Sequence, residues 1–384
     1  MHKYIVMKFG GSTLSDINKI NNCANKIISK FNDYFPIVVV SAMGDTTQNL
    51  SNLISKITSQ PTSLVDSANP IMSQYNQHAN SIKSTTIQSN IATDLILSTG
   101  EMVSAGMLSL SLNAKNYKSQ PVCGWQMPMI TNSNHGSAKI EKLSKNYINS
   151  LIQNQTIPII TGFQGVSPAN NITTLGKEGS DLTAVALADQ FNAHCYIYKS
   201  VDGVFTCDPN SNPGQKINQL SYDNMQIASE HGAQVIYHRA VKYAKKHNVK
   251  IFIQSAFTKA NGTTISNSPS NQNIITKQRA FLTILNQNNP IPNGHAFISY
   301  DQKWCLFSNQ KELQNYLEIC DAKIQNPKHI KITLIHPQKI IKENFIQIAK
   351  KYSSIYSCME SYSWICVQSK HVKDLERELH IGFI

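Results

Sequence analysis

One stretch of the chain concentrates the residues best suited to chemistry. Residues 173–181 read Thr-Thr-Leu-Gly-Lys-Glu-Gly-Ser-Asp, and the alanine-rich sequence that follows predicts a helix. Unpaired N–H groups at a helix start, together with the helix dipole, favour an anion. Gly176 and Gly179 let the backbone come close to that anion, because they carry no Cβ. The stretch therefore predicts either a phosphate-binding turn or a helix capped by Ser180 and Asp181 without a ligand.

A second glycine turn lies near the N-terminus. Residues 4–7 predict a buried strand, which leads into Lys8-Phe9-Gly10-Gly11-Ser12-Thr13 and then into a helix with one apolar face. In a strand, Gly-Gly turn and helix, backbone amides cradle phosphate oxygens, and Lys8 adds a mobile positive charge. The Walker pattern is absent, because no Gly-Lys-Ser/Thr follows a four-residue spacer. Taken alone, this segment favours a plain turn.

Small hydroxyl residues follow the next predicted strand. Residues 36–40 form a run rich in β-branched side chains, typical of a strand that is buried on both faces. Such a strand delivers Ser41 to the carboxyl end of a parallel sheet, where open α/β folds bind ligands. Thr46 and Thr47 come next and could bind a carboxylate or cap a helix.

A glutamate interrupts an otherwise apolar helical pattern. Residues 91–112 predict a long helix that carries Ser-Thr-Gly-Glu at positions 98–101. A carboxylate is costly to bury unless it is paired. Glu101 is therefore interpreted either as an anchor for an ammonium group or as an exposed helix carboxylate.

The remaining elements of this region predict the fold class. Residues 138–154 predict a helix and residues 157–161 a buried strand that ends at Gly162 and Phe163; Phe163 could support a substrate through packing and its backbone. Strands that alternate with helices of this length indicate an α/β fold, with a mostly parallel sheet and helices on both faces.

Length and composition describe a globular chain with a basic surface. The 384 residues suffice for one large α/β domain and a second, smaller domain. A composition of 41% hydrophobic and 15% charged residues excludes a disordered chain. The net charge of +12 suits anionic ligands. No basic cluster is interleaved with aromatic residues, so no specific nucleic-acid partner is expected.

The cysteines and the N-terminus indicate the compartment. The eight cysteines are scattered, without a Cys-x-x-Cys pair or a zinc spacing, so we expect no metal ligands in the protein and a reducing environment. The N-terminus lacks a signal-peptide pattern, and no stretch is expected to reach the length needed to span a bilayer. These features predict a cytoplasmic protein with no membrane partner.

The tail changes character from about residue 277. Residues 280–284, 329–335 and 364–368 predict strands, and residues 342–352 and 370–380 predict helices. This order predicts a second, smaller α+β domain.

Several motifs occur together in the order found in aspartate kinases of the amino-acid kinase family, which the first two-thirds of the chain resembles. They are residues 8–13, 41–47, 98–101, 162–166, 173–209, 220–225, 232–233 and 239–241. The resemblance implies a three-layer amino-acid-kinase sandwich over residues 1–275. It also implies a shortened, ferredoxin-like domain over residues 276–384, similar to ACT domains, with a regulatory or dimerisation role. The turn at residues 336–339, His-Pro-Gln-Lys, lacks the glycine found in effector-binding ACT turns. A homodimer that forms through the C-terminal domain is expected.

The resemblance also implies a reaction. ATP phosphorylates the side-chain carboxylate of L-aspartate to 4-phospho-L-aspartate, the first step of the branch to lysine, threonine and methionine. Mg²⁺ would be held mainly by phosphate oxygens and water. Lys8 and Asp181 are the expected catalytic residues, with Asp181 orienting Lys8. The expected ATP-binding residues are Lys8, Gly10, Gly11, Ser12, Ser200, Phe205, Asp208 and Lys216. The expected substrate-binding residues are Ser41, Thr47, Glu101, Phe163, Lys177 and Ser180.

Some positions depart from the family pattern. Lys177 stands in place of an arginine, so a point charge replaces a planar fork, and Glu178 stands in place of a glycine. Ser200 replaces an aspartate, and Asn210 and Gln254 replace arginines. These changes leave two alternatives open: a catalytically weak homologue that serves as a nucleotide-binding regulatory subunit, and an amino-acid kinase with another carboxylate acceptor.

Overall fold

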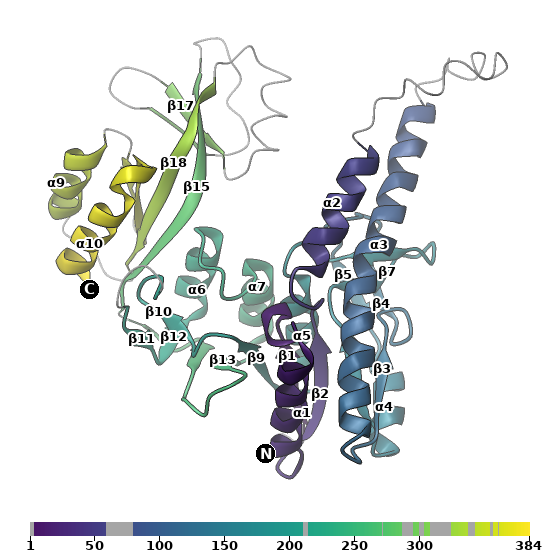
Figure 1. The fold of residues 1–384 in the computed structure, drawn as a ribbon. Coiled ribbons are helices and arrows are strands. Elements are labelled where there is room, and N and C mark those ends of the chain that lie inside the picture. Colours follow the sequence, from purple (N-terminus) through teal and green to yellow (C-terminus); the bar gives the residue numbers. More distant parts are fainter. Residues whose placement is uncertain are drawn as a thin grey trace, which may run out of the picture. The chain divides into compact units, whose positions relative to one another are not determined.

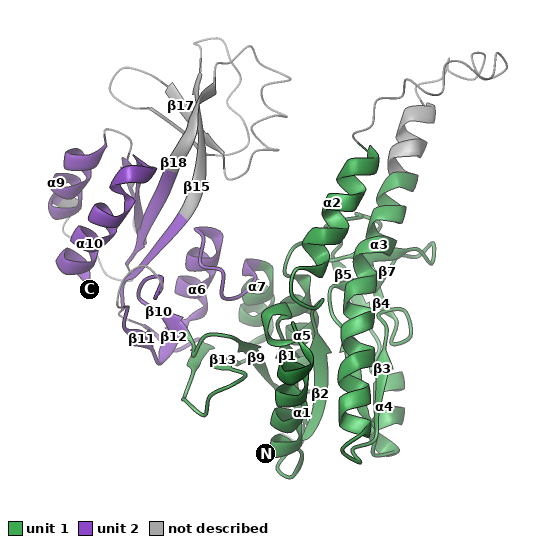
Figure 2. Cartoon of the chain, in the orientation of Figure 1, with its two compact units in different colours: residues 1–203, 239–266 green, residues 204–238, 267–384 purple. Residues whose placement is uncertain are grey.

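The chain folds into two compact units. The computed structural model describes residues 4–58, 80–209, 214–270, 272–285, 295–298, 303–307, 324–336, 342–353, 356–359 and 361–384. Unit 1 comprises residues 1–203 and 239–266, and unit 2 comprises residues 204–238 and 267–384 (Figure 2). The chain thus leaves unit 1, contributes a segment to unit 2, and returns. The predicted domain boundary at residues 275/276 stays a prediction.

Unit 1 is built on a mostly parallel sheet, as predicted. Its strands lie in the order β14 (Thr263–Ser266), β13 (Ile251–Ser255), β9 (His194–Lys199), β1 (Tyr4–Phe9), β2 (Phe35–Val40), β6 (Ile157–Thr161) and β3 (Ser119–Val122). All neighbours pair in parallel except β13 with β14. The central strands are buried on both faces, which explains their continuous β-branched runs.

Helices cover the two faces of this sheet and complete three layers (Figure 1). Met7 and Phe9 of β1 pack against α1 (Ile17–Phe31) and α3 (Asn80–Asn113) in one apolar core. On the other face, α5 (Gly179–Gln190) packs against β1, β2 and β9. Because successive side chains of a strand point to opposite faces, Lys8 faces α5.

A smaller sheet and further helices complete unit 1. The sheet has the order β5 (Ile140–Leu143), β4 (Met129–Thr131), β7 (Gln164–Val166) and β8 (Ile172–Thr174). The other elements are the 3-10 turn η1 (Gly11–Thr13), α2 (Thr46–Thr58), α4 (Asn146–Gln153) and α7 (His238–His247).

The prediction of a helix over residues 138–154 is wrong in its first half. Residues 140–143 form β5, which pairs antiparallel with β4 through Met129 and Leu143, and only α4 is helical. Pairing with β4, the strand that precedes it in the chain, overrides the local helical pattern.

Helix α3 is longer and more apolar than expected. In the described part of the chain, its segment Gln88–Asn113 is long and apolar enough to cross a membrane by length and composition alone, and 44% of the apolar window is buried. The expectation that no stretch reaches that length is therefore wrong. The helix packs on α1, β3, β6 and β8 and buries Asp94 and Glu101, which is the pattern of a core helix.

Unit 2 contains an antiparallel sheet with helices, consistent with the predicted ACT-like α+β domain. The strand order is β16 (His295–Ile298), β17 (Lys303–Phe307), β15 (Ile274–Leu285), β18 (Ile324–Ile335), β20 (Tyr362–Gln368) and β19 (Tyr356–Cys358). Apolar residues of β18 and β20 form a core with α9 (Lys342–Tyr352) and α10 (Val372–Phe383). The unit also holds β10 (Val204–Phe205), β11 (Lys216–Ile217), β12 (Gln219–Ser221), α6 (Tyr222–Glu230) and η3 (Ser369–His371).

Two sets of residues singled out in the sequence lie outside the described residues. They are Asn210 and residues 337–339 of the His-Pro-Gln-Lys turn.

Candidate active site

A buried ion pair lies at the carboxyl end of β1. Lys8 is 3% exposed and Asp181, in the first turn of α5, is fully buried; Lys8 Nζ lies 2.7 Å from Asp181 Oδ1. Burial lowers the pKa of Lys8 by removing water from the ammonium group, and the Asp181 charge opposes that shift. A cation held by one buried carboxylate suits an anionic ligand at this sheet edge.

A second lysine shares the same carboxylate. Lys199 is the last residue of β9, and its Nζ lies 3.7 Å from Asp181 Oδ2. We did not single out Lys199 from the sequence. The signal was present, because the lysine ends a strand whose carboxyl end reaches the ligand edge of a parallel sheet.

The Gly-Gly turn after β1 is closely packed. Gly11 has to be glycine, because a Cβ there would lie 2.5 Å from the carbonyl oxygen of Ala42. The Gly10 amide donates to the Tyr198 carbonyl at 3.1 Å, so it is not free to donate to phosphate as expected from the sequence. Gly11 and the exposed Ser12 remain the candidate amide donors.

Glu101 is a buried, half-satisfied carboxylate. It is 4% exposed, and Oε1 accepts a hydrogen bond of 3.0 Å from the Ala42 amide. Oε2 is buried, and no partner for it is found among the described residues. Burial raises the pKa of Glu101 to about 8, while the Ala42 amide and the Lys8 charge act in the opposite direction. Oε2 therefore suits an incoming ammonium group.

Gly100 allows helix α3 to pack closely against the end of strand β2. A Cβ on Gly100 would lie 2.6 Å from the Ala42 Cβ. Its absence lets Glu101 reach the segment after β2, where Ser41 and Thr47 are half-buried. The structure thus brings Glu101 to the hydroxyl residues that the sequence singled out.

The turn before α5 is strained at Glu178. This residue adopts φ 61° and ψ 19°, the left-handed region that favours glycine. It is also the N-cap of α5 and makes no side-chain cap, so the predicted capping by Ser180 and Asp181 is wrong. The Asp181 carboxylate pairs with Lys8 instead.

The other substrate candidates lie along this turn. Ser180 is buried against Gly162, where a Cβ would lie 2.5 Å from the Ser180 Cβ. Phe163 is buried with φ 71°, its amide donates to Thr183 Oγ1 at 3.2 Å, and its carbonyl accepts from the Leu175 amide at 2.9 Å. Lys177 is exposed.

The expected nucleotide residues are divided between the units. Ser200 is exposed and belongs to unit 1. Phe205 and Lys216 belong to unit 2, where they are partners in the β10–β11 ladder. Asp208 Oδ2, in the same unit, lies 3.1 Å from Lys277 Nζ.

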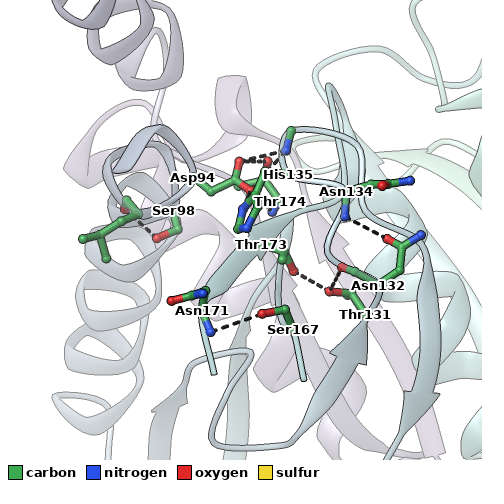
Figure 3. Close-up of polar contacts among 12 residues, drawn as sticks. Asp94, Ser98, Thr131, Asn132, Asn134, His135, Ser167, Asn171, Thr173 and Thr174 are labelled. Atoms are coloured by element: carbon green, nitrogen blue, oxygen red, sulfur yellow. Dashed lines mark hydrogen bonds and ion pairs between the residues drawn. The ribbon is translucent and has the colours of Figure 1, made fainter. Parts of the chain in front are cut away.

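Asp94, which the sequence reading missed, fixes the start of the strained turn (Figure 3). Its fully buried carboxylate lies 2.7 Å from His135 Nδ1 and accepts the amides of Gly136 and Thr174, each at 3.1 Å. The Thr174 hydroxyl also donates to it at 2.6 Å. Asp94 lies two helical turns before Glu101, so one helix carries both the ammonium candidate and the residue that holds β8.

Arg239 holds the next residue of the same turn. Its guanidinium donates to the carbonyls of Leu175 at 2.9 Å and Ala138 at 2.8 Å, and to Ser137 Oγ at 3.3 Å. Asp94 and Arg239 therefore fix the chain from both sides before it enters the Gly176–Asp181 turn.

The described residues contain no group of three or more His, Cys, Asp or Glu side chains placed to hold a metal ion.

Comparison with known proteins identifies the family. The model of the amino acid kinase family matches residues 3–255. An aspartokinase of Geobacillus stearothermophilus is 38% identical over 283 residues, which cover 72% of this chain and 62% of that protein. Aspartokinase 2 of Bacillus subtilis (strain 168) is 36% identical with the same coverage, so the chain spans less than two-thirds of the length of these relatives. An aspartokinase of Rickettsia prowazekii (strain Madrid E) is 29% identical over 99% of this chain and 78% of its own length.

Solved structures agree on the fold. E. coli aspartokinase III, in complex with aspartate and ADP, matches with a TM-score of 0.74 at 19% identity, over 98% of this chain and 99% of that chain. The aspartate kinase of Clostridium acetobutylicum matches with a TM-score of 0.69 at 18% identity, over 99% and 100%. The fold, the order of motifs and the family match over most of the chain lead to one conclusion: this chain belongs to the amino acid kinase family and is similar to its aspartokinases.

Proposed function

We propose that this chain catalyses the ATP-dependent phosphorylation of the side-chain carboxylate of L-aspartate, giving 4-phospho-L-aspartate and ADP. The observation that carries this proposal is the meeting of two buried groups of opposite kind at one sheet edge. Lys8 supplies a cation for phosphate, and Glu101 offers an unpartnered oxygen for an ammonium group. The two are close enough for the Lys8 charge to lower the pKa of Glu101. A substrate with an amino group and a carboxylate acceptor suits this pair.

On the substrate side, Glu101 binds the α-ammonium group. Lys177 binds the α-carboxylate as a point charge, and the hydroxyls of Ser41, Thr47 and Ser180 orient the acceptor carboxylate. Phe163 supports the substrate by packing and through its backbone. The similarity to aspartokinases and the bound aspartate of the E. coli enzyme favour aspartate as this substrate.

On the nucleotide side, Lys8 and the amides of Gly11 and Ser12 bind the phosphates. Gly10 shapes the turn, since its amide is used by Tyr198. Ser200, Phe205, Asp208 and Lys216 complete nucleotide binding. Mg²⁺, held by phosphate oxygens and water, would neutralise charge on the nucleotide.

The reaction needs positioning and charge neutralisation rather than covalent catalysis. An oxygen of the acceptor carboxylate attacks the γ-phosphorus, the bond from phosphorus to the bridging oxygen breaks, and ADP leaves with that electron pair. Lys8 stabilises the charge on the transferring group. Asp181 keeps the Lys8 ammonium oriented, and its negative charge opposes the loss of the Lys8 proton on burial.

The wider setting follows from the same similarity. Residues 1–275 form the catalytic domain, and residues 276–384 form an ACT-like domain for regulation or homodimerisation. The protein acts in the cytoplasm, with neither a membrane nor a specific nucleic acid as partner. Its product enters the branch to lysine, threonine and methionine.

The turn before α5 motivates two alternatives. Glu178 adds a side chain and a negative charge where glycine would be relaxed, and Lys177 offers no bidentate fork. A catalytically weak homologue that binds nucleotide as a regulatory subunit would tolerate both changes. An amino-acid kinase with another carboxylate acceptor would fit the loss of the fork.

The test is aspartate-dependent ADP release with Mg-ATP. Wild type should turn over with aspartate in preference to other amino acids that carry a side-chain carboxylate, and Lys8→Ala should lose about 10²–10³-fold in kcat because a charge-stabilising donor is removed. Lys246→Ala, at an exposed lysine of α7, should keep wild-type activity. ATP that stabilises the fold without any turnover would support the regulatory subunit instead. Turnover only with a different acid would support an amino-acid kinase with another carboxylate acceptor.

A further inference from the structure

We propose that Lys199 binds the transferring phosphoryl group together with Lys8, so that the site works with a pair of lysines. This inference rests on the function proposed above. It assigns a substrate-contacting role to a residue that was not among the expected site residues.

The placement of Lys199 follows from the pairing of β9 with β1. These strands are parallel neighbours with Phe9 opposite Tyr198, so the residues that follow both strands lie at one edge. A Cβ built on Gly10 would lie 3.8 Å from Lys8 Nζ and 3.6 Å from Lys199 Cδ. Both lysine side chains therefore pass the bare Cα of Gly10, on the approach to the Gly-Gly turn.

The two lysines compete for one carboxylate. Asp181 Oδ1 forms a close ion pair with Lys8 Nζ at 2.7 Å, whereas Oδ2 is 3.7 Å from Lys199 Nζ, which is too long for a hydrogen bond. The Lys199 side chain is only 17% exposed. An ammonium group on a mostly buried side chain that its carboxylate does not hydrogen-bond is stabilised by an arriving anion.

The surrounding groups favour a phosphoryl group as that anion. Helix α5 points its N-terminus at the same place, and Gly11 and Ser12 offer amides nearby. A phosphoryl group presents several oxygens at once, and it can accept from two ammonium groups and from amides together. A carboxylate has only two oxygens and is better matched to a single planar partner.

The titratable groups around Lys8 come from α5, the turn before it, β9 and α3. They are Asp181, Glu178, Lys199, Cys195 and Glu101; burial raises the pKa of the Cys195 thiol and keeps it neutral. Among them Lys199 lowers the pKa of Lys8, while Asp181 and Glu178 raise it. Removal of the Lys199 charge should therefore raise the pKa of Lys8.

The experiment compares Lys199→Met with Lys199→Arg, using Lys26→Met as the matched control. Lys26 lies over the ring of Tyr198, beside the same strand, and donates to the Thr258 carbonyl. We expect Lys199→Met to lower kcat by about 10–100-fold while KM for aspartate changes less than about twofold, and Lys199→Arg to recover part of the rate. The alkaline limb of the kcat profile should move to higher pH in Lys199→Met only.

The outcomes separate this inference from the proposed function. If wild type is active and Lys199→Met behaves like Lys26→Met in rate and pH profile, the role of Lys199 is refuted and the kinase function stands. If wild type is inactive, a second measurement tests the lysine pair: the increase in melting temperature caused by ATP or inorganic tripolyphosphate. A shift that Lys199→Met loses and Lys26→Met keeps supports the lysine pair without the kinase reaction. The lysine pair is overturned if both variants keep the increase in melting temperature, or if wild type shows no increase.

Discussion

At the scale of single residues, Glu101 has the clearest physical signature. Burial raises its pKa to about 8, so the folded protein prefers the neutral acid at neutral pH. An ammonium group placed against Oε2 would favour the carboxylate and lower that pKa again. Substrate binding and loss of the Glu101 proton are therefore linked.

This linkage gives a prediction for Glu101→Gln. Below about pH 4.5 the carboxyl is protonated in both folded and unfolded states, and from there to about pH 8 its ionisation in the unfolded state increasingly favours unfolding. The Gln variant should thus be more stable than wild type at pH 8, by roughly 4 kcal/mol, and the difference should shrink toward pH 4.5. Thermal unfolding across this pH range measures it.

The same variant tests the binding role. Calorimetry of aspartate binding at pH 7, in buffers of different ionisation enthalpy, should detect release of about one proton in wild type and none in Glu101→Gln. Wild-type affinity should rise between pH 6 and pH 8. Binding without proton release would contradict an ammonium contact at Glu101.

At the scale of elements, the turn from β8 into α5 combines rigid ends with a strained centre. Asp94 and Arg239 fix residues 174 and 175, and Lys8 fixes Asp181. Between these anchors Glu178 is held at φ 61°. Left-handed backbone at a non-glycine residue costs roughly 1–2 kcal/mol, and such strain persists only where the surroundings determine the conformation.

Glu178→Gly should relieve this strain. We expect a gain of about 0.5–1 kcal/mol in the free energy of unfolding, because the greater freedom of glycine in the unfolded chain offsets part of the relief. Loss of the negative charge near Lys8 should also tighten ATP binding. Urea unfolding and ATP titration measure the two effects.

Glu178→Gln is the matched control for this prediction. It keeps the left-handed backbone and removes only the charge. It should tighten ATP binding as Glu178→Gly does, without the gain in stability. Equal stability of the Gly and Gln variants would show that the strain at Glu178 does not exceed the entropic cost of glycine.

At the scale of the whole molecule, each unit has its own core, and the chain crosses between them. Unit 2 is assembled from two separate segments, residues 204–238 and 267–384. Lys331 of β18 links them, since its Nζ lies 3.3 Å from His231 Nδ1 and 5.4 Å from the ring centre of Trp364. Lys331 is 4% exposed, and burial lowers its pKa to about 8.

Lys331→Met should therefore stabilise the protein at neutral pH. Below about pH 8 the lysine is charged in both states and the full burial cost is present; the cost falls as pH rises to the ordinary value of 10.5, where it vanishes. We expect a gain of roughly 1–3 kcal/mol at pH 7, reduced by the lost contacts with His231 and Trp364, and no gain near pH 10.5. Melting temperature as a function of pH measures this.

Thr333→Val provides the control on the same strand. The Thr333 hydroxyl is buried, and no hydrogen-bond partner for it is found among the described residues. Its replacement should stabilise the protein equally at all pH values, because no titratable group is removed. A Lys331→Met effect with no pH dependence would show that burial does not lower the pKa of Lys331.

Features that depend on local pattern could be predicted from the sequence. β-branched runs predict the buried strands β2 and β6 because a strand covered on both faces cannot alternate with polar residues. Strands that alternate with helices predicted the α/β fold, and the order of the motifs carried the resemblance to the family. The site roles of these residues stay predictions, although the structure brings Lys8 and Asp181 together.

Two kinds of feature could not be read from local pattern: which distant residues share a site, and which hydrogen bonds and ion pairs local groups make. Lys199 is recognised as a site residue by its contact with Asp181, and Asp94 by its contacts with His135 and Thr174. These partners lie on other elements of the fold. Residues 140–143 became a strand because β4 supplies their hydrogen bonds. The return of the chain to unit 1 at residue 239 likewise leaves no local pattern. Periodicity and turn chemistry encode backbone conformation over a few residues, whereas burial, pairing and pKa depend on contacts that the fold creates.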